Sequence, residues 1–464
     1  MNRIIIFGTG KYYNQRKEYL KDVEIIVFLD NDINKQGKLL DGVKIISPEE
    51  VVNYCYDYII LMSMYQYDMK KQLLALNIEN NKILEYTEIG KFDLYNQKFN
   101  NQYSFPVNYE KANKKKALLL SNDLDNSGAP RALAEVGNIL IKFDYEVYVI
   151  SPIRGKLEEY YSSLGMHILI DPNITITNGK FREWLNKMDF NICFINTILY
   201  HYLINDIQKF KIKFIWWIHE NIDLPVCQFE NYKIEKGPNL KICVVGHLAR
   251  KVMCEKFQLN QSTDLLYGFA DKFVSSSVIP PRGKLKFALI GYIHPIKGQD
   301  IFLKAISMLS RSIMNITEFY IVGRISDKKL FNELLKISAN IENIKYLDEL
   351  SPENMLNFYN AIDIIVCPSR CDTMPMVVAE GLMNHKVCII SDKTGYSQLL
   401  TDKKNSLIFE TENVMELKNK IEWITNNSQL IVEIGDNGRK IYDKYFSEKV
   451  FRNNIKRLIK MTIS

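Results

Sequence analysis

Residues 364–380 read Ile-Ile-Val-Cys-Pro-Ser-Arg-Cys-Asp-Thr-Met-Pro-Met-Val-Val-Ala-Glu, which predicts a buried strand, a loop and a helix. Pro375 suits the first helical position, because proline there loses no needed N–H. The loop acid Asp372 therefore stands near backbone N–H groups at a helix start, and Glu380 lies about one and a half turns inside that helix. An anion bound beside a polyhydroxyl group, as in a nucleotide sugar, fits this arrangement.

A second strand–loop–helix element precedes this one in the chain. The strand Phe287–Ile290 ends at Gly291, and a short loop leads to Lys297 and Gly298 at a helix start. Lys297 is placed to neutralise a phosphate, and Gly298 lets backbone approach it closely. A solvated lysine beside a capping glycine is the alternative, which the acidic motif in the same half disfavours. Glu380 lies in an apolar stretch and needs a partner, which two ribose hydroxyls would supply.

Strand and helix patterns alternate along most of the 464 residues, a length that suggests about three domains. Arg3–Phe7 opens the first series, Ala117–Leu120 the second and Phe287–Ile290 the third. A polar, aperiodic stretch at 96–115 predicts a linker between the first two. Alternating units of this kind form parallel sheets, whose ligands bind beyond the carboxyl ends of the strands. We therefore expect a ligand cleft between the second and third series.

Residues from about 115 to 464 resemble retaining glycosyltransferases of the GT-B fold, glycosyltransferase family 4. The resemblance rests on motifs in the family's order: Gly291 with Lys297-Gly298, Ile321-Val322-Gly323, Leu356–Asp363, and Pro368-Ser369 before an acid-x7-Glu motif. It implies an α/β protein with two facing Rossmann-like domains. These would be an acceptor domain at 116–280 and a nucleotide-sugar donor domain at 285–445, before a C-terminal helix at 446–464 that crosses back to the acceptor domain.

The resemblance also implies roles for single residues of the donor half. Asp372 and the backbone amides of Thr373 and Met374 would hold the donor sugar, and Glu380 would bind the ribose. The family usually has glutamate as the first acid, so Asp372 is one methylene shorter. An arginine often follows the glycine at position 291. Tyr292 stands here instead, so Lys297 would carry more of the diphosphate charge, helped by Gly323 and Arg324.

Two features of the acceptor half match the family as well. Asn126–Arg131 resembles its Gly-rich loop, in which Gly128 would let backbone approach the diphosphate or the acceptor; a plain turn glycine is the alternative. His219 ends the strand Phe214–Ile218 and matches a histidine near the donor sugar, although a lone histidine is more often structural. The predicted catalytic residues are thus His219, Asp372 and Lys297.

Residues 1–95 resemble the Rossmann-like accessory domain that precedes some sugar-modifying enzymes. Gly8 and Gly10 follow a strand and open a helix, and Asp30 ends the second strand, where it suits a ribose contact. The third glycine position is Tyr13, so the dinucleotide fingerprint is incomplete. We therefore favour an accessory nucleotide-binding or docking domain, dispensable for transfer, over an NAD-dependent oxidoreductase.

The composition of the chain limits which classes of binding partner fit it. The net charge of +6 is too small, and too evenly spread, for nucleic acid as the main partner. Eight scattered cysteines lack metal-ligand spacing, and no apolar run reaches the ~20 residues of a membrane span. We expect a cytoplasmic protein without metal or other cofactor. Lysines at 114–116 and 209–213 suggest a peripheral contact with the anionic inner membrane face.

The sequence predicts a retaining glycosyltransferase that moves a sugar from a UDP-, GDP- or dTDP-linked donor to a glycan or lipid-linked acceptor. Cell-surface polysaccharide or glycoconjugate synthesis is the expected process. Catalysis would be electrostatic, with Lys297, loop amides and a helix terminus stabilising the leaving diphosphate. The alternatives are a non-catalytic nucleotide-sugar-binding scaffold, a transferase for soluble protein acceptors, and an oxidoreductase centred on Gly8 and Gly10.

Overall fold

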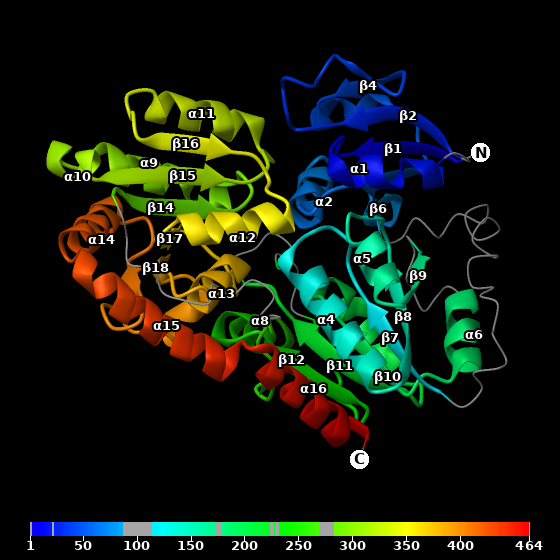
Figure 1. Cartoon of the computed structure of the whole chain (residues 1–464). Coiled ribbons are helices and arrows are strands. Elements are labelled where there is room, and N and C mark those ends of the chain that lie inside the picture. Colours follow the sequence, from blue (N-terminus) through cyan, green and yellow to red (C-terminus); the bar gives the residue numbers. More distant parts are fainter. Residues whose placement is uncertain are drawn as a thin grey trace. The chain divides into compact units, whose positions relative to one another are not determined.

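A computed structural model describes residues 2–20, 23–86, 114–171, 179–222, 227, 232–268 and 283–463. The chain divides into two compact units. The first comprises Met1–Cys243, Met253–Ser262 and Ile459–Ser464, and the second comprises Val244–Val252 and Thr263–Leu458. Three sheets, almost entirely parallel, form the frame of these units (Figure 1).

The first sheet has the order β3-β4-β2-β1-β5-β6, with only β3 and β4 antiparallel. Its central strands are apolar on both sides, because alternate residues point to opposite faces and both faces are covered. Ile4 and Ile6 of β1 belong to one buried cluster, and Ile5 and Phe7 to the other. The elements are β1 Arg3–Phe7, α1 Lys11–Arg16, β2 Glu24–Leu29, β3 Leu39–Leu40, β4 Val43–Ile46, β5 Tyr58–Leu61, α2 Gln66–Ala75 and β6 Ile83–Glu85.

The second sheet has the order β13-β12-β11-β10-β7-β8-β9, and most of its residues lie in the first unit. Neighbouring strands β10, β7 and β8 are parallel, and helix α4 packs on β7 and β8. The elements are β7 Lys115–Leu120, α4 Gly128–Lys142, β8 Tyr145–Ser151, α5 Glu158–Ser163, β9 His167–Ile170, α6 Gly179–Met188, β10 Ile192–Ile195, η6 Ile198–Leu203, α7 Ile204–Ile207, β11 Lys213–Ile218, β12 Leu240–Val244, α8 His247–Phe257 and β13 Thr263–Asp264.

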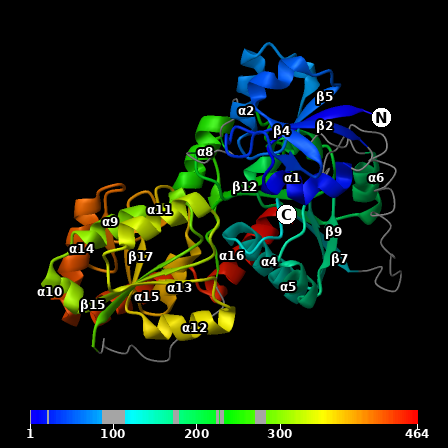
Figure 2. The same cartoon turned by 90° about the horizontal axis from the view of Figure 1, so that it is seen from above.

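The third sheet has the order β16-β15-β14-β17-β18-β19 and lies in the second unit. Helices α9, α11 and α14 cover one face and α13 and α15 the other (Figure 2). The elements are β14 Leu285–Ile290, η8 Pro295–Lys297, α9 Gln299–Ser307, α10 Arg311–Asn315, β15 Thr317–Val322, α11 Lys328–Ser338, β16 Ile344–Leu347, α12 Pro352–Ala361, β17 Ile364–Cys367, α13 Met376–Met383, β18 Val387–Ser391, β19 Leu407–Phe409, α14 Val414–Asn426, α15 Ile431–Tyr445 and α16 Glu448–Ile463.

The α/β architecture confirms the prediction, and strand β1 has the predicted bounds, Arg3–Phe7. Lys115 was predicted to end the linker but begins β7, where it pairs with Tyr145. Pro375 occupies the N-cap of α13, one residue before the predicted position. Most of the predicted linker lies outside the described residues, and the domain boundaries stay predictions. None of the described helices is long and apolar enough to cross a membrane.

Candidate functional site

The loop after β14 is held in one conformation by close backbone packing. Gly298 ends η8 and caps α9 with a left-handed backbone, φ 70°. A Cβ at this position would lie 2.1 Å from the Pro368 carbonyl oxygen, so no side chain fits there. Because β14 and β17 are neighbouring strands, this contact brings Lys297 beside the loop that follows β17.

Lys297 and Asp372 form an ion pair at the carboxyl ends of β14 and β17. The Lys297 Nζ donates to Asp372 Oδ2 over 2.5 Å, and the side chains are 21% and 16% exposed. Burial alone would lower the pKa of Lys297. The Asp372 charge, the Tyr292 phenol and the hydrogen bond to Asp372 offset burial, so the pKa of Lys297 is raised and the ammonium stays charged. Tyr292 lies beneath it, with 5.3 Å between Nζ and the ring centroid.

The backbone around Asp372 is pinned by the loop after β18. Asp372 N donates to the Lys393 carbonyl, and Gly395 N donates to the Asp372 carbonyl. The side chains of Thr373 and Met374 are buried, so these residues can meet a ligand only through their backbone. Helix α13 begins at Met376 with Pro375 as its N-cap, and it has no acidic residue in its first turn, which leaves the helix terminus suited to an anion.

Arg370 fixes this loop to the β14 loop, a contact that the sequence analysis missed. Its guanidinium donates to both Asp300 carboxylate oxygens, each over 2.9 Å, and to the Pro295 carbonyl. It also forms an ion pair with Glu412. Hydrogen bonds to Asp300 help raise the pKa of Arg370, so the clamp remains charged. Asp300 and Arg370 are 70 residues apart, and no sequence spacing indicates the pair.

Glu380 has a partner that the sequence analysis also missed. The buried Tyr359 of α12 donates its hydroxyl to Glu380 Oε2 over 2.6 Å. The partner expected from burial therefore exists within the protein, and it orients the carboxylate. Tyr359 lies in the stretch Leu356–Asp363 that carries the family resemblance, and this position is the signal that could have drawn attention to it.

Gly323 and Arg324 follow β15 at the same edge of the sheet. Gly323 has φ 144°, and a Cβ there would lie 2.3 Å from the Gly291 carbonyl oxygen, so the β14 and β15 ends approach closely. The Arg324 carbonyl accepts from Ile293 N, and its half-buried side chain forms no ion pair with any other described residue. Five predicted donor-site residues therefore follow the adjacent strands β14 and β15. They are Gly291, Lys297, Gly298, Gly323 and Arg324.

His219 follows β11 in the first unit and is held by an amide. Its Nε2 lies 2.6 Å from Asn196 Oδ1, while Asn196 Nδ2 donates to the Ala129 carbonyl over 2.8 Å. The carbonyl can only accept, which fixes the amide, so His219 Nε2 carries the proton. Burial lowers the pKa of His219 to about 3, and the imidazole is neutral. Gly128, one residue before Ala129, is the first residue of α4.

The proposed accessory nucleotide site has its own internal partners. The Asp30 carboxylate accepts from Thr9 N and its hydroxyl, from Lys35 Nζ and from Asp32 N. Gly8 has φ 106°, and a Cβ there would lie 2.7 Å from the Met62 carbonyl oxygen. Gly8 and Asp30 therefore have structural reasons for their identity, and α1, which Gly10 caps, is only six residues long.

Several surface lysines predicted as a membrane contact have partners in the first unit. Lys114 pairs with Asp144, Lys209 pairs with Asp206, and Lys116 Nζ donates to the Met188 carbonyl. Less of their charge is therefore available to an anionic surface. Within the described ranges, no group of three or more His, Cys, Asp or Glu side chains is arranged to hold a metal ion.

Two segments match known families. Residues 272–441 match the family model described as glycosyl transferases group 1. Residues 1–84 match a model described as C2185-like, N-terminal.

Curated relatives share modest identity with the chain. An uncharacterized glycosyltransferase of Methanocaldococcus jannaschii is 28% identical over 179 residues, 38% of this chain and 48% of the relative, so the match spans about half its length. One of Haemophilus influenzae is 22% identical over 363 residues, 73% of this chain and 98% of the relative. The poly(ribitol-phosphate) alpha-N-acetylglucosaminyltransferase of Staphylococcus aureus is 24% identical over 169 residues, 35% and 33% of the two chains.

Solved structures show the fold. A glycosyltransferase of Rickettsia africae aligns with TM-score 0.64 at 18% identity, covering 76% of this chain and 99% of its own. The Anabaena protein HepE, crystallised with UDP and glucose, aligns with TM-score 0.61 at 13% identity, covering 75% of this chain and all of its own. Such identities show the fold alone, and they confirm the predicted GT-B fold beside an additional N-terminal sheet.

Proposed function

We propose that this chain, which carries a glycosyltransferase group 1 domain within a GT-B fold, transfers a sugar from a nucleotide-sugar donor with retention. One observation carries the proposal. The Lys297–Asp372 ion pair and the Tyr359–Glu380 hydrogen bond position a cation after β14, one carboxylate after β17 and a second carboxylate in α13. A diphosphate, a hexose and a ribose need these three groups.

Donor binding would exchange the partner of Lys297. The ammonium would leave Asp372 for the diphosphate, which also meets the backbone before α13 and the side chain of Arg324. Asp372 would then accept hydrogen bonds from sugar hydroxyls. Glu380, oriented by Tyr359, would accept from the ribose. Each charged group thus keeps a partner in both states, so that no charge is left buried alone.

The transfer step follows from this charge arrangement. The bond between the anomeric carbon and the diphosphate oxygen breaks, and the acceptor oxygen bonds to that carbon on the same face. The acceptor proton passes to a diphosphate oxygen, so the electron pair and the proton both end on the leaving group. Lys297 and the helix terminus stabilise the growing negative charge. A pKa of about 3 makes the neutral His219 a poor proton donor near pH 7, so we assign it no proton transfer.

The donor class and the acceptor class belong to the proposal. UDP-sugars are the first donors to test, because HepE was crystallised with UDP and glucose. A glycan or lipid-linked glycan of the cell surface is the proposed acceptor, supported by the name of the Staphylococcus aureus relative, which acts on poly(ribitol phosphate). We place the reaction in the cytoplasm, without a metal.

A thermal-shift screen of the full chain against UDP-, GDP- and dTDP-sugars tests the donor assignment. Binding of one nucleotide class is expected to raise the melting temperature of the wild type and to have a much smaller effect on Glu380→Ala. Equal shifts in both proteins would place the nucleotide elsewhere. No shift with any donor, combined with no donor hydrolysis, would contradict the proposal.

A further inference from the structure

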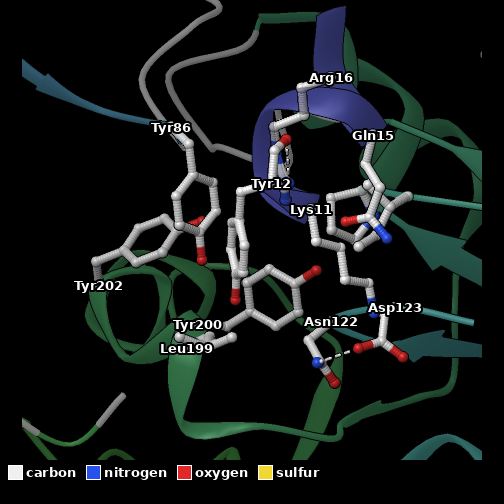
Figure 3. A pocket seen from close by; sticks show the side chains of 12 residues that line it. Lys11, Tyr12, Gln15, Arg16, Tyr86, Asn122, Asp123, Leu199, Tyr200 and Tyr202 are labelled. Carbon is white, nitrogen blue, oxygen red and sulfur yellow. Dashed lines mark hydrogen bonds between the residues drawn. The ribbon is translucent and has the colours of Figure 1, made fainter. Parts of the chain in front are cut away.

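A pocket lies in the first unit, between helix α1, the loops that follow β7 and β8, and the η6 turn after β10 (Figure 3). It contains about 550 Å³ of space, a figure that includes solvent at its open mouth. Lys11, Gln15 and Arg16 come from α1, and Asn122 and Asp123 come from the loop after β7. Tyr12, Tyr86, Tyr200 and Tyr202 contribute aromatic rings. The pocket contains none of the residues assigned to the donor site.

Arg16 is the unusual member of this pocket. It is 1% exposed, yet it forms no ion pair with any described residue. Its Nη1 donates to the Tyr12 carbonyl over 3.3 Å, while its buried Nε has no hydrogen-bond partner. The guanidinium carbon lies 5.0 Å from the Tyr12 ring centroid and 4.4 Å from that of Tyr86. Cation–π contacts compensate only part of the cost of burying a charge, and the Asp123 carboxylate in the same wall attracts Arg16 without forming an ion pair with it.

The other lining groups suit a saccharide. Tyr200 donates its hydroxyl to the Ser121 carbonyl over 2.8 Å, which fixes its ring, and Tyr200 and Tyr202 meet edge to face at 6.4 Å. Fixed aromatic rings give a sugar ring an apolar surface to pack on. The buried Gln15 Oε1 also lacks a partner and can accept from a hydroxyl. Asn122 Nδ2 donates to Asp123 Oδ2 over 2.9 Å, and both residues add polar groups to the wall.

We propose that this pocket binds an acidic saccharide, a sugar ring carrying a carboxylate or a phosphate, at a site separate from the donor site. The acid group pairs with Arg16, the ring packs on the tyrosines, and hydroxyls meet Gln15 and Asn122. A nucleotide fits less well, because Gly8 and Asp30, which would bind its phosphate and ribose, are not among the residues that line this pocket. The site does not depend on the proposed transferase activity.

The acidic saccharide has two possible sources, a free sugar phosphate or sugar acid, and an acidic unit within a longer glycan. Titration calorimetry on the full chain with glucose 6-phosphate and glucuronic acid tests the first source. An oligosaccharide of alternating glucuronic acid and N-acetylglucosamine tests the second. Glucose is the neutral control. We expect at least one acidic probe to bind and glucose not to bind. The probes that bind then show whether the source is a free sugar, a longer glycan or both.

Variants separate this site from the donor site. Arg16→Gln is expected to weaken the acidic probe at least about tenfold, because a charged hydrogen bond is lost. Glu380→Ala is expected to leave that binding unchanged while weakening UDP. Because Arg16 is buried, Gln15→Ala is a second variant that removes an acceptor without removing a charge, and it should weaken the same probe about threefold or more.

Three results would overturn the proposal. The first is that none of the acidic probes binds the folded wild type at millimolar concentration. The second is that glucose binds as tightly as the acidic probes. The third is that Gln15→Ala and a folded Arg16→Gln both bind the probe like the wild type. UDP binding measured on the same samples reports the donor site independently, so failure of either assignment is visible on its own.

Discussion

Replacement of Asp372 by asparagine tests how Lys297 changes partner when a donor binds. Without ligand, the Lys297 ammonium is 2.5 Å from the Asp372 carboxylate, and both side chains are mostly buried. A diphosphate must draw Lys297 away from this partner, so part of its binding free energy is lost in breaking the pair. Asp372→Asn removes the competing charge. UDP, which has no sugar to contact residue 372, is therefore expected to bind more tightly to the variant.

The size of the effect follows from the pair that is broken. A hydrogen bond to a charged group contributes roughly 1.5–3 kcal/mol. The asparagine oxygen retains a neutral hydrogen bond to Lys297, so the lower end, about 1.5 kcal/mol, applies, and UDP affinity should rise about tenfold. Turnover of the complete donor should fall at the same time, because the sugar hydroxyls lose a charged acceptor.

Titration calorimetry of UDP against wild type and Asp372→Asn measures this change. Glu342→Gln is the matched control, because this substitution removes the same unit of negative charge. Glu342 is exposed and precedes β16, at the amino end of that strand. Only the Asp372 variant should gain affinity. Unchanged or weaker UDP binding in Asp372→Asn would refute the partner exchange. An equal gain in UDP affinity in the control would show that the gain comes from the general loss of negative charge.

Three further outcomes are expected. Tyr359→Phe should keep the fold but weaken nucleotide binding about threefold to tenfold, since Glu380 loses its 2.6 Å hydrogen bond. Nucleotide affinity equal to that of the wild type would show that Tyr359 does not position Glu380. Because burial lowers the pKa of His219 from 6.5 to about 3, the unfolded chain binds the extra proton below pH 6.5, so stability falls as pH drops from 6.5 toward 3. His219→Gln should reduce that slope by up to about 1.4 kcal/mol per pH unit in urea unfolding, and an identical slope would contradict the burial. Deletion of residues 1–104 should lower the melting temperature, because it exposes Tyr200 and Tyr202 to solvent, and it should change UDP affinity by less than about twofold. Loss of UDP affinity in a folded protein would show that this segment contributes to the donor site.

The sequence predicted the local elements of the donor half well, for a physical reason. Runs such as Ile364–Cys367 are apolar throughout, as strands covered on both faces must be. Lys297, Gly298, Asp372 and Glu380 lie beside these strands at positions set by short loops, so their approximate places follow from local patterns. Because β14 lies beside β17 in the sheet, the motif around Lys297 and the motif around Asp372 meet in one site.

Contacts between distant segments could not be predicted from the sequence. Tyr359 reaches Glu380 across 21 residues, and Arg370 reaches Asp300 across 70. Both pairs depend on strand order and helix packing, which no residue spacing reports. Asp30 illustrates the same limit. Its spacing suited a ribose contact, which stays a prediction, but spacing cannot reveal that Thr9 and Lys35 hydrogen-bond the carboxylate.

Release of nucleoside diphosphate from a nucleotide sugar is the most direct test of the central claim that Lys297, Asp372 and Glu380 form a donor site. Phosphorus NMR of the full chain with UDP-, GDP- and dTDP-sugars, with and without a glycan acceptor, measures that release. At least one donor should be cleaved by the wild type, and Lys297→Ala should slow cleavage about 10²–10³-fold while remaining folded. Cleavage of no donor, or equal rates in the wild type and Lys297→Ala, would contradict the account.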